Sequence, residues 1–176
     1  KRESRQGEGK GILGKMLQFS LSYPDHPYGV SPIKSPFTGS VLKYVEDFSE
    51  IISNDKLLAK EKELLSIVTS ELGEGRNCVV YVEYAKDPET CVSYRLKEIL
   101  QKHCSLSDHE VVIIESSYPS AAKRESWMHK KAKEGAKVFI VQPKCVETGL
   151  DFCWRDKEGN IYNYPTLIFY QIGYSL

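Results

Sequence analysis

Three short apolar runs, separated by segments long enough to form helices, constrain the fold of this chain more than any other feature. They are NCVVYVEY at residues 77–84, EVVIIE at 110–115 and KVFIV at 137–141. The last run shows no polar alternation and lies between Gly135 and Pro143, which is typical of a strand covered on both faces. Strands that alternate with helices pair in parallel through right-handed crossovers. The pattern therefore predicts an α/β fold with a mostly parallel sheet and helices on both faces.

Helical periodicity fills the segments around these strands. Apolar residues recur at three-and-four spacing over residues 56–72, after the capping sequence Ser53-Asn54-Asp55, so we expect a helix there. The further expected elements are a helix over 87–103, a loop and helix over 116–135, a polar excursion with turn residues over 154–164 and a last strand over 166–170.

The N-terminal part, residues 1–54, is expected to be an extension and connector in front of a domain at 55–176. Residues 1–10 are polar and glycine-rich, which predicts a linker leading into a short helix around 12–21. Residues 23–39 contain four prolines and show no regular period, which indicates a connector, because proline removes backbone donors and disfavours helical geometry.

Residues 9–15, GKGILGK, match the G-x-x-x-x-G-K spacing of a phosphate-binding loop. Met16 stands where a Ser or Thr would bind magnesium, and the preceding residues are charged rather than apolar. Because such a loop has to follow a buried strand and open a helix, we expect no phosphate site here.

The composition excludes several classes of protein. The 24 Lys and Arg residues balance the 24 Asp and Glu residues, so the net charge is zero. A strongly basic nucleic-acid domain is therefore not indicated, although zero net charge is compatible with a local basic face. No apolar run approaches the roughly 20 residues that span a bilayer, and the N-terminus lacks a signal-peptide core. The five cysteines include no C-x-x-C pair, so we expect neither disulfides nor a zinc site, and a cytoplasmic location. Because the apolar runs are short, we also expect no membrane contact.

The polar loop after the run at 137–141 is the first place to expect chemistry, because ligands gather at the carboxyl ends of parallel strands. In this loop Thr148 and Gly149 offer a hydroxyl and an exposed amide, which suit a phosphate. The alternative is a turn in which Thr148 caps its own backbone and Gly149 supplies unusual dihedral angles. Asp151, from the residue alone, suits a helix or turn cap.

Four passages in order resemble the second RecA-like domain of superfamily 2 helicases, most closely the SNF2-like and DEAD/DEAH-type helicases of bacterial and phage mobile elements. The resemblance spans roughly residues 55–176. The passages are KEKELLSIVTSELGEGRNCVVYVEY, similar to the approach to motif IV; KRESWMHK at 123–130, similar to the helix after the next strand; QPKCVETGLDF at 142–152, similar to motif V; and YPTLIFYQIGYSL at 164–176, similar to the approach to motif VI.

The resemblance implies half of an ATP-dependent motor. Its partners would be a nucleic acid, with DNA favoured over RNA, and a first RecA-like domain of the same polypeptide. ATP and Mg²⁺ would bind the full-length protein, and this chain alone would bind neither. Motif VI with its paired arginines, the Walker A lysine and the DEAD/DEAH carboxylates are not in the sequence. We therefore expect no catalytic residue and no ATP hydrolysis from this chain alone.

The resemblance also implies roles for individual residues. Those expected at the nucleic acid are Thr148, Gly149, Lys123, Arg124, Ser116 and Ser117, and those expected at the ATP cleft are Asp151, Gln171 and Gly173. For the lysine-rich helix the alternative is a solvated face balanced by Glu125 and Glu134, and for the serines a plain loop. Trp127 is interpreted as a core anchor rather than a base-stacking platform.

Two other functions are compatible with the sequence. One is a RecA-like binding or adaptor module without motor activity. The other is a small nucleotide-binding enzyme that uses residues 9–15, which predicts ATP binding that is lost in Lys15→Ala.

Overall fold

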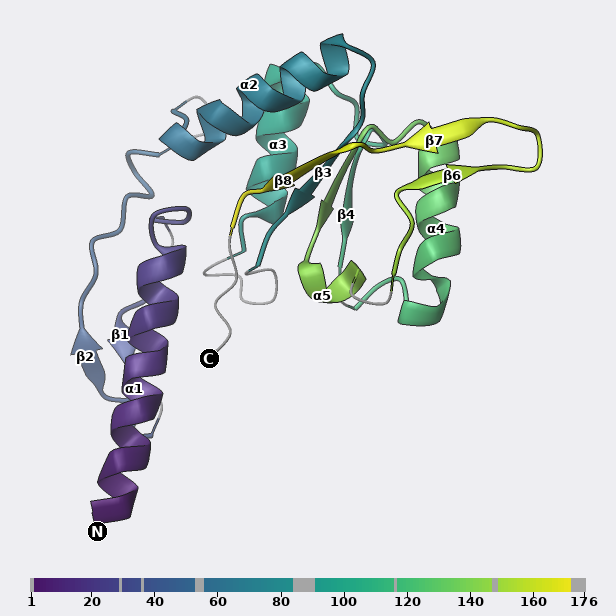
Figure 1. Cartoon of the computed structure of the whole chain (residues 1–176). Coiled ribbons are helices and arrows are strands. Elements are labelled where there is room, and N and C mark those ends of the chain that lie inside the picture. The colour runs from purple at the N-terminus through teal and green to yellow at the C-terminus, as the bar shows by residue number, and fades with distance from the viewer. Residues whose placement is uncertain are drawn as a thin grey trace. The chain divides into compact units, whose positions relative to one another are not determined.

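The computed structural model divides the chain into two compact units, residues 1–57 with 86–91, and residues 58–85 with 92–176 (Figure 1). The division falls a few residues after the expected boundary at 54/55. The residues that the structure describes are 2–28, 30–35, 37–52, 56–83, 91–115, 117–146 and 149–171.

A four-stranded parallel sheet forms the centre of the second unit. Its strands are β3 (Cys78–Tyr81), β4 (Val111–Ile114), β5 (Val138–Val141) and β8 (Thr166–Phe169), in the order β4-β5-β3-β8. All residues of β3 and β5 are buried, as expected for central strands with both faces covered. The edge strand β8 instead alternates in burial.

Helices cover both faces of this sheet, which confirms the predicted α/β class and is consistent with a RecA-like arrangement. Helices α2 (Ala59–Gly73) and α3 (Ser93–His103) lie on one side, and α4 (Ala121–Lys133) lies on the other (Figure 1). On the α4 side, alternate strand residues such as Val79 and Phe139 pack with Met128 in one apolar cluster.

Helix α2 begins later than the sequence predicts. Leu58 is its N-cap, and the Glu61 carboxylate accepts a hydrogen bond from the Leu58 N–H at 2.7 Å. The expected cap at residues 53–55 lies outside the described residues and is not adjacent to the helix. Glu61 is 1% exposed and pairs with Arg95 of α3, whose Nη2 donates to Oε2 at 2.9 Å. This buried ion pair joins α2 to α3.

The expected polar excursion at 154–164 forms an antiparallel hairpin of β6 (Cys153–Arg155) and β7 (Ile161–Asn163). Asp156 forms its turn, since its Oδ1 accepts from the N–H groups of Glu158 and Asn160 at 3.1 and 2.8 Å. The Trp154 ring stacks on His129 of α4 with centroids 4.0 Å apart. The hairpin is therefore packed against the core and is not a loose loop.

The first unit contains α1 (Arg2–Ser22) and the two short strands β1 (Ile33–Lys34) and β2 (Val41–Lys43), which pair antiparallel. The prediction of a linker over residues 1–10 is wrong, because α1 starts at Arg2. Residues 9–15 therefore lie inside a helix, where backbone amides bond to carbonyls of the preceding turn and cannot surround a phosphate. This geometry removes the phosphate loop as a candidate site. No described helix is long and apolar enough to cross a membrane.

Candidate functional site

Two glutamine side chains join the carboxyl ends of three neighbouring strands. Gln142 directly follows β5, and its Nε2 donates to the backbone carbonyl of Glu83, just beyond β3, at 2.7 Å. Gln171 follows β8, and its Oε1 accepts from the Glu83 N–H at 3.2 Å. Both glutamines are buried, at 7% and 3% exposed. We call this arrangement of Gln142, Glu83 and Gln171 the glutamine link.

The glutamine link leaves one polar atom unsatisfied. Among the described residues, the Oε1 of Gln142 has no hydrogen-bond partner although it is buried. A buried acceptor without a donor costs about 1–3 kcal/mol, so this atom reduces the stability that the link contributes. Of the residues expected at the ATP cleft, Gln171 belongs to this link, and Gly173 lies outside the described residues.

The loop after β5 contains a single helical turn, α5 (Pro143–Val146), followed by a tight turn. Gly149 has a positive φ of +81°, and its N–H donates to the Val146 carbonyl at 3.1 Å. The exposed Asp151 accepts from the Cys153 N–H at 2.8 Å through its Oδ1. Gly149 and Asp151 thus have the turn geometry expected from the sequence as the alternative to a ligand contact. Thr148 lies outside the described residues.

Arg124 occupies a different place from the one expected of a phosphate contact. It is 5% exposed, and its Nη1 donates to the Cys145 carbonyl at 2.9 Å, while Nη2 donates to the Pro119 carbonyl at 3.2 Å. The guanidinium therefore joins α4 to α5 and to the loop after β4. Because the group is enclosed and already bonded, the structure argues for an anchoring role instead of a nucleic-acid contact.

A hollow of about 510 Å³ opens beside the N-terminal half of α4 and the loop that precedes it. It brings together Ser117 and Lys123, two of the residues expected at the nucleic acid, with Lys130 and the rings of Tyr118 and Trp127. Ser116 lies outside the described residues. Trp127 is half-buried and also packs against the core cluster, as expected for an anchor.

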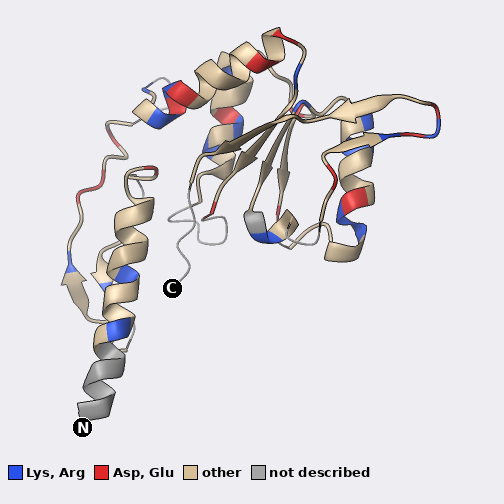
Figure 2. Ribbon diagram, in the orientation of Figure 1, with Lys and Arg blue, Asp and Glu red and all other residues tan. Residues whose placement is uncertain are grey.

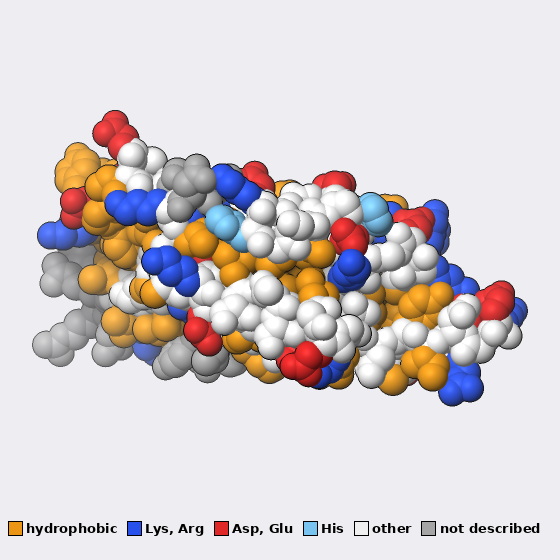
Figure 3. Space-filling view, turned by 90° about the horizontal axis from the view of Figure 1, so that it is seen from above, with side chains coloured by type: hydrophobic (Ala, Val, Ile, Leu, Met, Phe, Trp, Pro, Cys, Tyr) orange, Lys and Arg blue, Asp and Glu red, His pale blue; other side chains and the backbone are white. Residues whose placement is uncertain are grey.

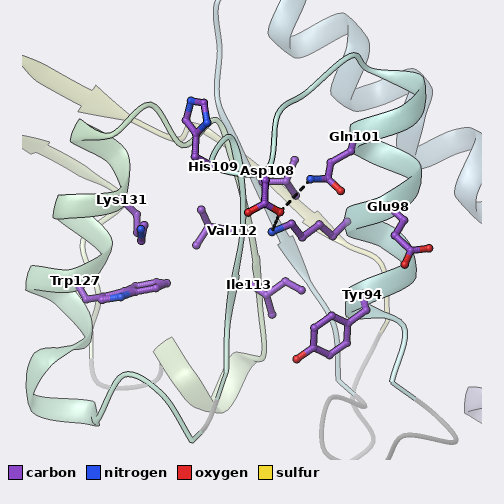
Figure 4. A pocket seen from close by; sticks show the side chains of 11 residues that line it. Tyr94, Glu98, Gln101, Asp108, His109, Val112, Ile113, Trp127 and Lys131 are labelled. Atoms are coloured by element: carbon purple, nitrogen blue, oxygen red, sulfur yellow. Dashed lines mark hydrogen bonds and ion pairs between the residues drawn. The ribbon is translucent and has the colours of Figure 1, made fainter.

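A second hollow, of about 520 Å³, lies at the free edge of β4 between α3 and α4 (Figure 4). Trp127 points into it from α4, and Tyr94 faces it from α3. Lys97 lies 2.7 Å from Asp108, and the Gln101 amide donates to the same carboxylate at 3.3 Å. The hydrogen bond from Lys97 lowers the pKa of Asp108, so these two charges compensate one another.

Charge is spread over the molecule. In Figure 2, basic and acidic residues both occur along α2, α3 and α4, in agreement with the zero net charge. The described part of the face in Figure 3 likewise shows single charges of both signs between apolar and polar side chains. Within α4, the lysines are accompanied by Glu125, and Glu134 follows the helix.

The described residues include no group of three His, Cys, Asp or Glu side chains that could hold a metal ion. All five cysteines are free, and Cys78 and Cys145 are buried. Burial raises the pKa of the Cys78 thiol to about 12, so it is protonated at neutral pH and acts as an apolar side chain.

Comparison with known proteins found no match: no family model fits the chain, and neither a curated protein nor a solved structure is significantly similar to it. The functional proposal therefore depends on the fold, the geometry at the strand ends and the four sequence passages.

Proposed function

We propose that this chain is the second RecA-like domain of an ATP-dependent nucleic-acid helicase or translocase. The glutamine link is the observation that carries the proposal. It joins the ends of β3, β5 and β8, the strands whose passages resemble motifs IV, V and the approach to motif VI. In a motor, loops that contact the nucleic acid have to move together with loops that contact the nucleotide. Hydrogen bonds across the strand ends support such coupling.

ATP would lie between this domain and a first RecA-like domain. Phosphoryl transfer requires a phosphate loop, magnesium and arginines together, and these would come from other parts of the motor. On this chain the exposed carboxylate of Asp151 is an acceptor, so it fits the hydroxyl or amino donors of a nucleotide better than its phosphates. The nucleic acid would contact Lys123, Ser117 and the turn at Gly149.

Nucleic-acid binding by the purified chain tests the proposal. Fluorescence anisotropy with labelled DNA should show binding that weakens steeply between about 50 and about 200 mM salt, because bound lysines release counterions. Lys123→Ala should lower the slope of log affinity against log salt by about one. Lys62→Ala is the matched control, since Lys62 is an exposed lysine on α2 and should leave the slope unchanged.

Two outcomes would contradict the proposal. A folded chain that binds neither single-stranded nor duplex DNA at low salt would favour a non-catalytic adaptor module. Magnesium-dependent ATP hydrolysis by this chain alone would mean that it contains the whole active site. The proposal requires instead that two domains each supply part of that site.

A further inference from the structure

An exposed tyrosine and two lysines line a hollow near the end of β4. The hollow, of about 510 Å³, is lined by Tyr118, Ser120, Lys123, Ser126, Trp127 and Lys130, and we call it the Tyr118 hollow. Tyr118 is 65% exposed, although a tyrosine ring is large and mostly apolar. Its ring centroid lies 6.1 Å from that of Trp127, with the two planes at 85°. The hollow therefore has an aromatic corner in which one ring is largely open to solvent.

The backbone that carries Tyr118 is anchored from inside the fold. The next residue, Pro119, is buried, and its carbonyl accepts from Nη2 of Arg124 at 3.2 Å. The same guanidinium is bonded to Cys145 of α5 at 2.9 Å. An exposed ring on an anchored backbone loses less freedom on binding than one on a mobile loop, so the site is preorganised.

Two lysines flank the aromatic corner. Lys123, Trp127 and Lys130 follow at spacings of four and three residues on one face of α4, so the lysine Cα atoms lie about 10 Å apart, on either side of the indole. Lys130 forms a long ion pair with Glu134, at 3.7 Å between exposed groups, which contributes little to stability. Both ammonium groups can therefore contact an anionic backbone while the rings contact its bases.

We propose that the Tyr118 hollow binds an unpaired base of a single-stranded nucleic acid, with the base stacked on Tyr118 and the adjoining phosphates beside Lys123 and Lys130. This inference rests on the proposed function and adds the form of nucleic acid that this surface selects. Aromatic rings along a positive groove bind single strands of any sequence, because every base has a flat face. In a duplex the bases are already stacked within the helix, so Tyr118 distinguishes an unpaired strand from a paired one.

Anisotropy with three DNA probes of equal length tests the inference: a single strand, its abasic analogue and a duplex. Tyr118→Ala should weaken binding of the single strand about tenfold, since one stacked base contributes 1–3 kcal/mol and each 1.4 kcal/mol is tenfold. Binding of the abasic strand and the duplex should not change. Tyr118→Phe should keep the affinity, and Tyr94→Ala, which removes another exposed tyrosine of the same unit, is the matched control.

Tryptophan fluorescence gives a second readout that does not depend on replacing Tyr118. In a Trp154→Phe background, Trp127 is the remaining tryptophan, and the single strand should quench it while the duplex should not. Salt-dependent DNA binding that is equal in Tyr118→Ala and the original chain would overturn the stacking site and leave the proposed function intact. Failure of the folded chain to bind any of the three probes would overturn both.

Discussion

At the scale of single residues, Arg124 shows how position on a helix outweighs charge. It lies in the most basic segment of the chain, next to the exposed Lys123. It also lies at the spacing of Met128 and Ala132, and these three are the buried residues of α4. A residue on this buried face of α4 points into the interior. The long side chain of Arg124 therefore places its guanidinium beside two backbone carbonyls, to which it donates.

Arg124→Met should therefore lower the free energy of unfolding by about 2–6 kcal/mol, because two buried carbonyls lose their donors at about 1–3 kcal/mol each. Urea denaturation followed by circular dichroism measures this difference. The control Lys123→Met, at an exposed position, should stay within about 0.5 kcal/mol of the original chain. Equal stabilities of the two variants would mean that Arg124 does not anchor the loop.

At the scale of elements, Glu71 connects the end of α2 to the start of β8. Its carboxylate accepts from Arg76 at 2.6 and 2.7 Å and from the hydroxyl of Thr166. These hydrogen bonds, with Arg76 the largest cause, lower the pKa of Glu71 from 4.5 to about 2. A carboxyl with a lowered pKa in the folded state stabilises the fold above its unfolded pKa, and the effect disappears as pH falls through the folded pKa.

Glu71→Gln should therefore be less stable than the original chain at pH 7, and the difference should shrink as pH falls from about 4.5 towards about 2. Urea midpoints of both proteins at a series of pH values measure the difference. Glu63→Gln, an exposed position of the same helix, is the control and should change little at any pH. A difference that stays constant with pH would exclude the Glu71 charge as its source.

The elements themselves were predictable where they bury an apolar face. The runs at 77–84, 110–115 and 137–141 became β3, β4 and β5, because a continuous apolar stretch can only be satisfied inside a covered sheet. Helix α1 was missed over its first residues, since a polar helix without an apolar stripe leaves no periodic signal. The hairpin at β6 and β7 was foreseen only as a polar segment with turn residues.

At the scale of the whole molecule, the candidate site depends on strand order, which local sequence does not encode. Gln171 and Gln142 were brought to Glu83 across 88 and 59 residues of chain. The order β4-β5-β3-β8 places the last strand beside the first, and only then do these three residues meet. The resemblance singled out Gln171 as a candidate, but the sequence contained no signal that Gln142 would bond to the backbone of the same residue, Glu83.

Because both glutamines bond to the backbone of Glu83, Gln171 to its N–H and Gln142 to its carbonyl, their contributions to stability should depend on each other. Gln142→Leu and Gln171→Leu should each destabilise the second unit, and the double variant should differ from the sum of the single effects by about 0.5–3 kcal/mol, as residues in one hydrogen-bond network do. Urea denaturation of the four proteins completes the cycle, with Gln101→Leu, distant from the link, as an additive control. If the stability effects of Gln142→Leu and Gln171→Leu are additive, the strand ends act separately. The proposal of a motor domain would then lose the support of the glutamine link.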